Sequence, residues 1–322
     1  MRLILVGNGP FGVPGFRDFY DSDHEVAAVV TSPLRPRRRG LVEPTPVRDL
    51  AEKHGSRILE PVSINAAETI EELESLDADL LVVCDYGQIL SARCLASARL
   101  GGVNLHGSLL PRYRGAAPIA WAIYNGETET GVTVIHMTPE VDAGPCIAQV
   151  TEPIDPEDTC QTLESRLAEI GGWALRRAVD SVEKGNLQAL PQDPKLASKA
   201  PRLKKTDGLI DWTRPAAAIK NHVRAMIPWP KTYTFWRRGD GKHVRLIVTQ
   251  TDVVDAPRPE AEAGFVVVAE GDELIVAAGE DAVRVRQIQP AGKKEMGARE
   301  FLRGYPVRPG ERFEAEIREE PE

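Results

Sequence analysis

The hydrophobic and polar positions of the first 184 residues follow two periods. Short apolar or β-branched runs, bounded by Gly, Asp or Pro, predict buried strands. Between several of them, apolar residues recur at helical spacing. This alternation is typical of an α/β domain with a largely parallel sheet. We expect strands over residues 3–6, 25–30, 80–84, 102–106 and 132–137, and helices over 45–53, 66–75, 116–124 and 159–184.

The pattern changes in the last third of the chain. A helix is expected over 215–225, and closely spaced strands follow it, separated by Gly-Asp, Asp-Ala and Ala-Gly-Glu turns. Short strands in such a series predict a small β-barrel of the oligonucleotide-binding (OB) type. The Pro-, Lys- and Ala-rich stretch 185–205 is interpreted as a linker between domains over 1–184 and 206–322. The expected strands are 232–237, 243–249, 264–269, 273–277 and 282–289.

The composition is that of an ordinary globular protein, with 42% hydrophobic and 27% charged residues among 322. No run approaches the roughly 18 apolar residues of a membrane span, and the first residues form a predicted strand rather than a signal peptide. The four cysteines form no C-x-x-C pair, so neither a zinc site nor a disulfide framework is indicated. We therefore expect a cytoplasmic monomer that binds no metal and no membrane.

Charge is distributed unevenly along the chain. The formal net charge is −8, yet twelve Lys and Arg stand against three Asp between residues 199 and 245. A second basic cluster comprises Arg35, Arg37, Arg38 and Arg39, and acidic residues gather over 314–322. Either these charges are only solvated, or the basic stretches form a patch for a polyanion such as RNA. The charge pattern alone leaves both interpretations open.

The segment Gly7-Asn8-Gly9-Pro10-Phe11-Gly12 satisfies the G-x-G-x-x-G pattern of dinucleotide sites. Such a site also needs an acidic residue near the end of the second strand, where it binds the ribose hydroxyls. That strand ends Val29-Val30-Thr31-Ser32-Pro33 without a carboxylate, and Pro10 lacks the backbone N–H that a pyrophosphate could use. We therefore expect a tight strand-to-helix turn and no bound nucleotide.

Candidate chemistry lies at the end of the predicted strand 102–106. Residues two apart in a strand point to the same face, so Asn104 and His106 project together, and Gly107 and Pro111 end the strand. The carboxyl edge of a parallel sheet is where α/β folds bind ligands. The strand 132–137 leads into a loop that carries Asp142, which we expect at the same edge.

An amide, an imidazole and a carboxylate suit acyl transfer to an amine without a covalent intermediate. Asn104 and His106 can stabilise the oxyanion that forms on the attacked carbonyl. Asp142 can accept the proton of the attacking amine, directly or through water, and can stabilise a charged His106. Each residue taken alone is more often structural, so the hypothesis depends on their convergence. No serine or cysteine nucleophile is indicated.

The run N-x-H-G-S-L-L-P-x-x-R-G-A-A-P-I, which begins at Asn104, resembles the signature of the folate-dependent formyltransferases. The resemblance covers nearly the whole chain. It extends to the family's pterin-pocket segment at 86–90 and to its catalytic aspartate loop at 142–144. It also extends to the family's C-terminal RNA-binding domain, at 210–212, 221–225, 228–230 and 289–296.

The resemblance implies a Rossmann-like formyltransferase domain followed by an OB-like domain. It implies transfer of the formyl group of 10-formyltetrahydrofolate to the amine of initiator methionyl-tRNA, with Asn104, His106 and Asp142 catalytic and with neither metal nor nucleotide. The folate would contact Gln88, Ile89, Leu90, Ser108, Leu109, Leu110, Pro111 and Val141. The tRNA would contact the arginine cluster Arg35, Arg37, Arg38 and Arg39 and the lysines Lys204, Lys205, Lys293 and Lys294.

Two other functions remain as alternatives. A formyltransferase acting on a nucleotide-linked amino sugar would share the first domain and the three catalytic residues, but the basic stretch 199–245 speaks against it. A non-enzymatic RNA-binding protein could use the same scaffold, but it would have no need of Asn104, His106 and Asp142 together.

Overall fold

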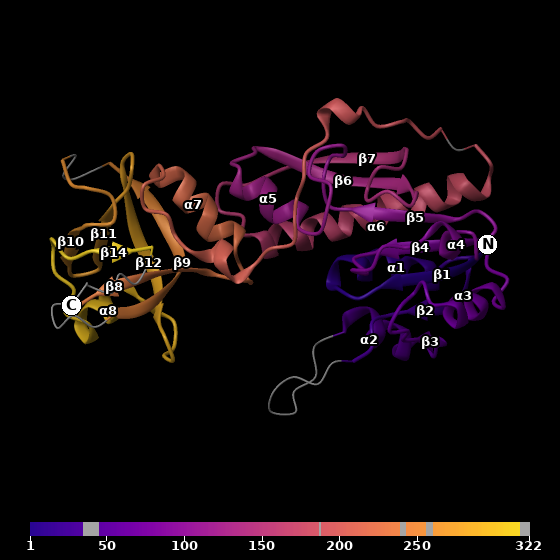
Figure 1. The fold of residues 1–322 in the computed structure, drawn as a ribbon, viewed down its shortest axis with the longest axis horizontal. Coiled ribbons are helices and arrows are strands. Elements are labelled where there is room, and N and C mark those ends of the chain that lie inside the picture. Colours follow the sequence, from indigo (N-terminus) through magenta and orange to yellow (C-terminus); the bar gives the residue numbers. More distant parts are fainter. Residues whose placement is uncertain (35–44, 187, 239–242, 256–259, 316–322) are drawn as a thin grey trace. The chain divides into compact units, whose positions relative to one another are not determined.

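The computed structural model describes residues 1–34, 45–186, 188–238, 243–255 and 260–315. The chain forms two compact units (Figure 1). The first comprises Met1–Ile119, Thr128–Ile154 and Thr162–Arg202, and the second comprises Ala120–Glu127, Asp155–Gln161 and Leu203–Glu322. Each unit has its own sheet and its own hydrophobic core.

The described part of the first unit contains one seven-stranded sheet, formed by β1 (Arg2–Gly7), β2 (Glu25–Val30), β3 (Ile58–Leu59), β4 (Leu80–Cys84), β5 (Gly102–His106), β6 (Glu129–His136) and β7 (Cys146–Pro153). The strand order is β3-β2-β1-β4-β5-β6-β7. Neighbours from β3 to β5 run parallel, whereas β6 is antiparallel to β5 and β7 is antiparallel to β6. The predicted, mostly parallel sheet is confirmed.

Helices cover both faces of this sheet. On one face, α3 (Ala67–Glu74) and α4 (Ala92–Leu95) pack on a core that includes Ile4, Val6 and Val83. On the other face α6 (Cys160–Glu183) lies so close that a Cβ at Gly171 would come within 2.9 Å of the Leu105 side chain. The remaining described helices of the first unit are the 3-10 helix η1 (Pro10–Gly12), α1 (Val13–Tyr20), α2 (Pro46–Lys53) and the 3-10 helix η2 (Pro194–Leu196). The helix α5 (Pro118–Tyr124) starts in the first unit and continues into the second.

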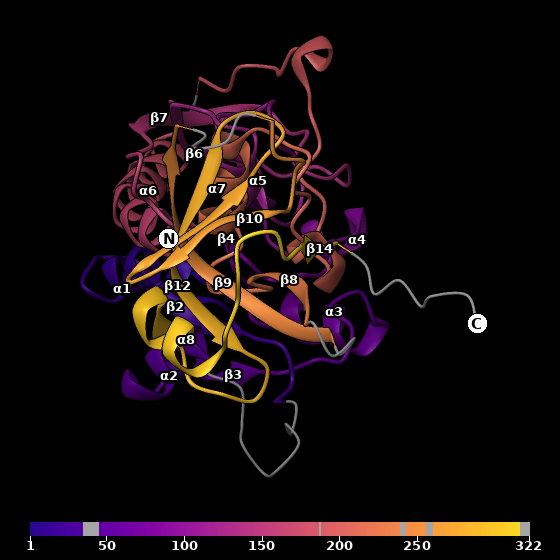
Figure 2. The ribbon, with the colours of Figure 1, turned by 90° about the vertical axis from the view of Figure 1, so that its left-hand side faces the viewer.

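The second unit is built on an antiparallel sheet of β8 (Thr232–Arg237), β9 (His243–Val254), β10 (Val266–Glu270), β11 (Glu273–Ala277), β12 (Ala282–Pro290) and β14 (Phe313–Glu314), with β13 (Met296–Gly297) beside β12. The order is β10-β11-β12-β9-β8-β14, and the sheet curls into the half-barrel of Figure 2. Trp236, Phe301 and Phe313 fill its core. The helices are η3 (Lys205–Gly208), α7 (Ala216–Ala225) and α8 (Ala298–Gly304). The predicted OB-like fold is confirmed.

Several elements of the described chain escaped prediction, most of them very short, and for the three longest the reasons are local. The helix α1 contains Pro14 and Gly15, which disguise its period. The strand β7 has the half-buried, half-exposed pattern of a sheet edge and lacks an apolar run, and α8 is a short helix of seven residues. No described helix is both long and apolar enough to cross a membrane.

Candidate active site

Asn104 and His106 lie at the carboxyl end of β5, near the middle of the first unit's sheet. Asn104 pairs with Val83 of β4 and with Ile135 of β6, so strands on both sides fix its backbone. Its side chain is half-buried, and no hydrogen bond engages its amide among the residues that the structure describes. His106 is only 5% exposed. The predicted pair therefore shares one strand end, with the amide available to a ligand.

Each nitrogen of the His106 ring has a polar neighbour. Its Nε2 lies 2.9 Å from the Tyr113 carbonyl oxygen, which can only accept, so the hydrogen bond requires a proton on Nε2. Its Nδ1 lies 3.5 Å from Oδ2 of Asp142. Tyr113 adopts a left-handed backbone conformation with φ of 62°. Because Nε2 carries the proton, Nδ1 of the neutral ring is unprotonated where it faces Asp142.

Asp142 reaches His106 by a route that the sequence did not indicate. Because β6 is antiparallel to β5, its last residue His136 pairs with Val103, so the following loop starts at the amino end of β5. A loop that starts there has to cross back before Asp142 can reach the carboxyl edge, where that residue was expected. The Asp142 carboxylate nevertheless lies beside His106, and its Oδ2 also accepts a 2.8 Å hydrogen bond from the Gly115 backbone N–H.

Gln192 joins the loops that carry these groups. Its Nε2 donates to the carbonyl oxygens of Asp142 and Gly144, at 2.8 and 2.7 Å. Its Oε1 accepts from Nε and Nη2 of Arg114, at 3.1 and 2.7 Å. Sequence reasoning missed this residue, which lies in the aperiodic stretch 185–205. No local pattern signals it, because its partners are about 50 residues away or more in the chain.

The turn after His106 is supported from β6 and β7. Ser108 is completely buried, and its hydroxyl donates to the Arg112 carbonyl oxygen at 2.6 Å. Thr133 of β6 accepts from the Leu110 backbone N–H and donates to the Ser108 carbonyl oxygen. Gln149 of β7 donates to the Leu110 carbonyl oxygen. Among the residues predicted to bind folate, Ser108 and Leu110 are therefore internal supports of the turn, whereas Leu109 and Pro111 are half-buried.

The other residues predicted at the folate lie on two loops. The side chain of Gln88 accepts from the Ile64 backbone N–H at 3.0 Å, and Asn65 donates to the Ile89 carbonyl oxygen at 2.8 Å. Leu90 is buried in the core. Two apolar side chains stay exposed, Ile89 at 62% and Val141 at 45%. An exposed apolar side chain on a tethered loop suits contact with a flat ring system.

The glycines of the G-N-G turn are explained by packing against β4. A Cβ at Gly7 would lie 2.4 Å from the Cys84 carbonyl oxygen, and one at Gly9 would lie 2.0 Å from Oδ2 of Asp85. Asn8 fills the turn, since its side chain donates to the Tyr86 carbonyl oxygen and accepts from the Ser32 backbone N–H. Close approach of the chain accounts for these small residues.

Burial keeps the described cysteines of this unit protonated. It raises the pKa of the Cys84 thiol well above its usual range and that of Cys94 to about 11. The pKa of Cys146 is also raised by burial, although nearby Arg114 opposes the shift. A thiol is nucleophilic as the thiolate, so none of the three suits covalent catalysis at neutral pH.

The residues predicted to contact tRNA are only partly described. Lys204, Lys205, Lys293 and Lys294 are exposed on the second unit. The cluster Arg35, Arg37, Arg38 and Arg39 lies outside the described residues.

Comparison with known proteins identifies the family of both units. Residues 1–179 match the formyl transferase family, and residues 202–306 match the formyl transferase C-terminal domain. The methionyl-tRNA formyltransferase of Rhodopirellula baltica is 45% identical over 329 residues, which cover 97% of this chain and 96% of the relative. The methionyl-tRNA formyltransferase of Geotalea uraniireducens is 40% identical over 311 residues, covering 96% and 97%.

Solved structures show the same fold at much lower identity. The sugar 3N-formyl transferase WlaRD superposes with a TM-score of 0.65 at 16% identity, over 91% of this chain and 99% of its own. HypX from Aquifex aeolicus, solved with tetrahydrofolic acid, gives 0.61 at 16% identity over 94% of this chain and 46% of its own. The fold is thus shared with a sugar N-formyltransferase and with HypX, whereas extensive sequence identity links this chain to one group. The chain belongs to the formyl transferase family and, within it, to the methionyl-tRNA formyltransferases.

Proposed function

We propose that the protein transfers the formyl group of 10-formyltetrahydrofolate to the amino group of initiator methionyl-tRNA. The observation that carries the proposal is the convergence of Asn104, His106 and Asp142 at one strand end, with Nδ1 of His106 3.5 Å from the Asp142 carboxylate. Two relatives named for this activity are 45% and 40% identical to the chain, and the match covers nearly the full length of each. No metal enters the proposed step.

In the proposed reaction the amine attacks the formyl carbon directly. A C–N bond forms, the carbonyl oxygen becomes an oxyanion, and collapse of this intermediate breaks the bond to N10 of the folate, which takes up a proton. The Asn104 amide, which has no partner among the described side chains, can donate to the oxyanion. Removing one such donor typically costs about 10²-fold or more in kcat.

The His106–Asp142 pair manages the proton. Because the Tyr113 carbonyl oxygen holds a proton on Nε2, a second proton on Nδ1 makes the ring an imidazolium. Asp142 is close enough to stabilise that charge, and the positive charge of the ring can in turn stabilise the oxyanion electrostatically. Asp142 also accepts the proton that the attacking amine loses, directly or through water.

The two substrates would occupy different surfaces. The exposed side chains of Ile89 and Val141 would contact the pterin ring, with Gln88 holding the loop. The tRNA would contact the exposed lysines Lys204, Lys205, Lys293 and Lys294, together with the arginine cluster of residues 35–39. We propose a domain boundary near the linker 185–205.

The alternative acceptor is a nucleotide-linked amino sugar, because WlaRD and related sugar N-formyltransferases share the fold. A transfer assay with labelled 10-formyltetrahydrofolate can offer methionyl-tRNA and such an amino sugar side by side. The proposal predicts label on methionyl-tRNA alone. Label on the sugar, with none on the tRNA, would overturn it.

A further inference from the structure

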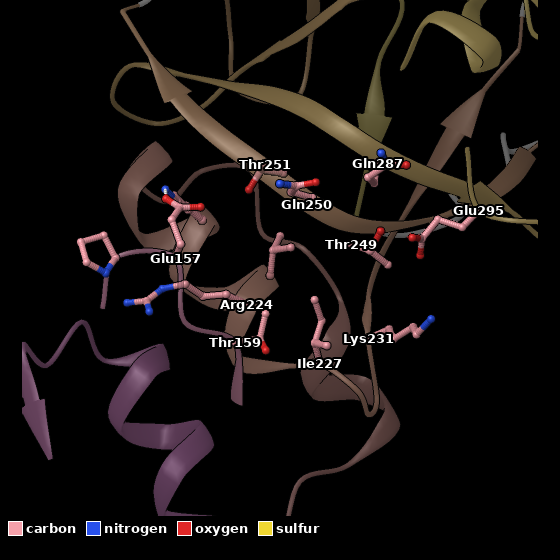
Figure 3. A pocket seen from close by; sticks show the side chains of 13 residues that line it. Glu157, Thr159, Arg224, Ile227, Lys231, Thr249, Gln250, Thr251, Gln287 and Glu295 are labelled. Atoms are coloured by element: carbon pink, nitrogen blue, oxygen red, sulfur yellow. Dashed lines mark hydrogen bonds and ion pairs between the residues drawn. The ribbon is translucent and has the colours of Figure 1, made fainter. Parts of the chain in front are cut away.

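A second site lies wholly within the second unit, between α7 and β9 (Figure 3). It is a pocket of about 270 Å³ with an apolar side and a polar side. Ile227 lies on one side and Gln250 and Gln287 lie on the strands opposite, and Val223 adds to the apolar lining. The active-site residues belong to the other unit, so catalysis leaves this pocket unexplained.

The strands deviate from regular pairing at this pocket. Gln287 of β12 pairs with Gln250 of β9, and the register shifts on both sides of Gln287. Such irregularities redirect side chains and are common beside functional sites. No hydrogen bond holds either glutamine amide within the described part of the chain. Two amides, each with donors and an acceptor, are therefore available to one ligand.

Two threonine hydroxyls at the pocket also lack partners. Thr249 and Thr251 line it, and neither Oγ1 has a hydrogen-bond partner among the residues described. A buried hydroxyl without a partner costs stability, whereas valine would fill the same strand position without that cost. Polar residues retained against stability are typical of functional sites. The hydroxyls can turn toward a ligand by rotation about the Cα–Cβ bond.

One cation of the pocket lining is available to an anionic group of a ligand. Lys220 forms an ion pair with Glu157, and the Arg224 guanidinium is held by the carbonyl oxygens of Asp155 and Asp158 at 3.1 and 3.0 Å. Lys231, at the opposite end, has no ion pair within the described residues. The exposed Glu295 is the remaining carboxylate of the lining. Since the charges of Asp155, Glu157 and Asp158 also act on Arg224, Lys231 is the cation of the lining that is left for an anionic ligand.

An exposed aromatic ring stands next to the pocket in the chain. Trp229 is 50% exposed. Ile227 and Lys231, which lie two residues before and two residues after it in the chain, both line the pocket. Pro228 and Pro230 flank it and restrict the backbone that presents it. Exposed tryptophans are the usual platforms on which unpaired bases stack.

We infer that this pocket and Trp229 bind one unstacked nucleotide of an RNA substrate. The volume is below the roughly 300–1,000 Å³ of pockets for larger ligands, so it suits a single ring system. The base would lie against Val223 and Ile227, its polar edge would meet the glutamine amides, and Lys231 would face a phosphate. The inference rests on the proposed function, since the RNA would be the tRNA substrate.

The test is filter binding of uncharged tRNA across a salt series. Trp229→Ala and Gln287→Leu should each weaken binding by about ten-fold. Because neither change removes a phosphate contact, the slope of log affinity against log salt should stay that of wild type. The matched control is Trp173→Ala, which removes a 55% exposed tryptophan of α6 in the other unit and should leave affinity unchanged.

Several outcomes would overturn the inference. Equal tRNA affinity in wild type, Trp229→Ala and Gln287→Leu would show that no base is bound here. If AMP, CMP, GMP or UMP raises the melting temperature of wild type but not of Gln287→Leu, while tRNA binding is unaffected, the ligand is a free nucleotide and not RNA. Formyl transfer by wild type to methionyl-tRNA is measured separately. Its absence would defeat the proposed function, whereas its presence with unchanged binding would defeat only this inference.

Discussion

Replacing Gln192 tests whether loop positioning matters for catalysis. The side chain makes four hydrogen bonds, two to the carbonyl oxygens of Asp142 and Gly144 and two from Arg114. Leucine has a similar volume and makes none of them. Gln192→Leu therefore releases the loop that places the Asp142 carboxylate 3.5 Å from Nδ1 of His106, without altering either residue.

The magnitude follows from these contacts. A typical hydrogen bond contributes about 1 kcal/mol net, so freeing the two carbonyl oxygens should lower the free energy of unfolding by about 2 kcal/mol, with water replacing Gln192 at Arg114. In a unit of roughly 190 residues, the size of the first unit, this corresponds to a melting temperature lower by about 4–8 °C. A displacement of about 1 Å at a catalytic group can cost about 10²-fold in rate, and we expect kcat to fall by that order.

The assay is steady-state formyl transfer together with thermal unfolding. Loop displacement predicts a lower kcat with nearly constant KM for methionyl-tRNA, because the proposed tRNA contacts do not include Gln192 or the Asp142 loop. Gln188→Leu, an exposed glutamine of the same stretch, is the matched control and should behave as wild type. A Gln192→Leu enzyme that is less stable but has wild-type kcat would refute the argument and leave Gln192 a purely structural residue.

Three further predictions concern other parts of the chain. Burial lowers the pKa of His222 from 6.5 to about 4. As the pH falls, the unfolded chain therefore binds the proton before the folded chain does, and unfolding titrations should show about 3 kcal/mol of stability lost between pH 6.5 and pH 4. The His222→Gln variant should not show this loss. Truncation after Arg202 should leave a folded unit that binds folate, because the first unit ends there, but filter binding should show most tRNA affinity lost. Replacing Arg37, Arg38 and Arg39 with Ala should raise KM for tRNA and flatten its salt dependence; an unchanged KM would contradict that contact.

The sequence predicted the strands of the site because their patterns are local. Strand β5 and the shared face of Asn104 and His106 follow from an apolar run, its period of two and the glycine that ends it. The direction of β6 could not be predicted in the same way. A strand buried on both faces has a continuous apolar pattern whether it runs parallel or antiparallel to its neighbour.

Contacts between distant segments were equally out of reach. Gln192 and Ser198 lie in a stretch without periodicity, yet Gln192 holds Asp142 and Ser198 accepts from the Tyr113 backbone N–H at 2.8 Å. The tautomer of His106 likewise depends on the Tyr113 carbonyl oxygen, a backbone group that any residue could supply. Such positioning depends on loop conformation, which residue types alone do not specify.

The most direct test of the central claim is single-turnover transfer of labelled formyl from 10-formyltetrahydrofolate to methionyl-tRNA by wild type, Asn104→Ala, His106→Ala and Asp142→Ala. The account predicts transfer by wild type and a rate lower by about 10²-fold or more in each variant, with folding and tRNA affinity retained. Combined substitutions should lose far less than the product of the single losses, because the three residues act as a unit. A wild-type rate in Asp142→Ala would contradict the account.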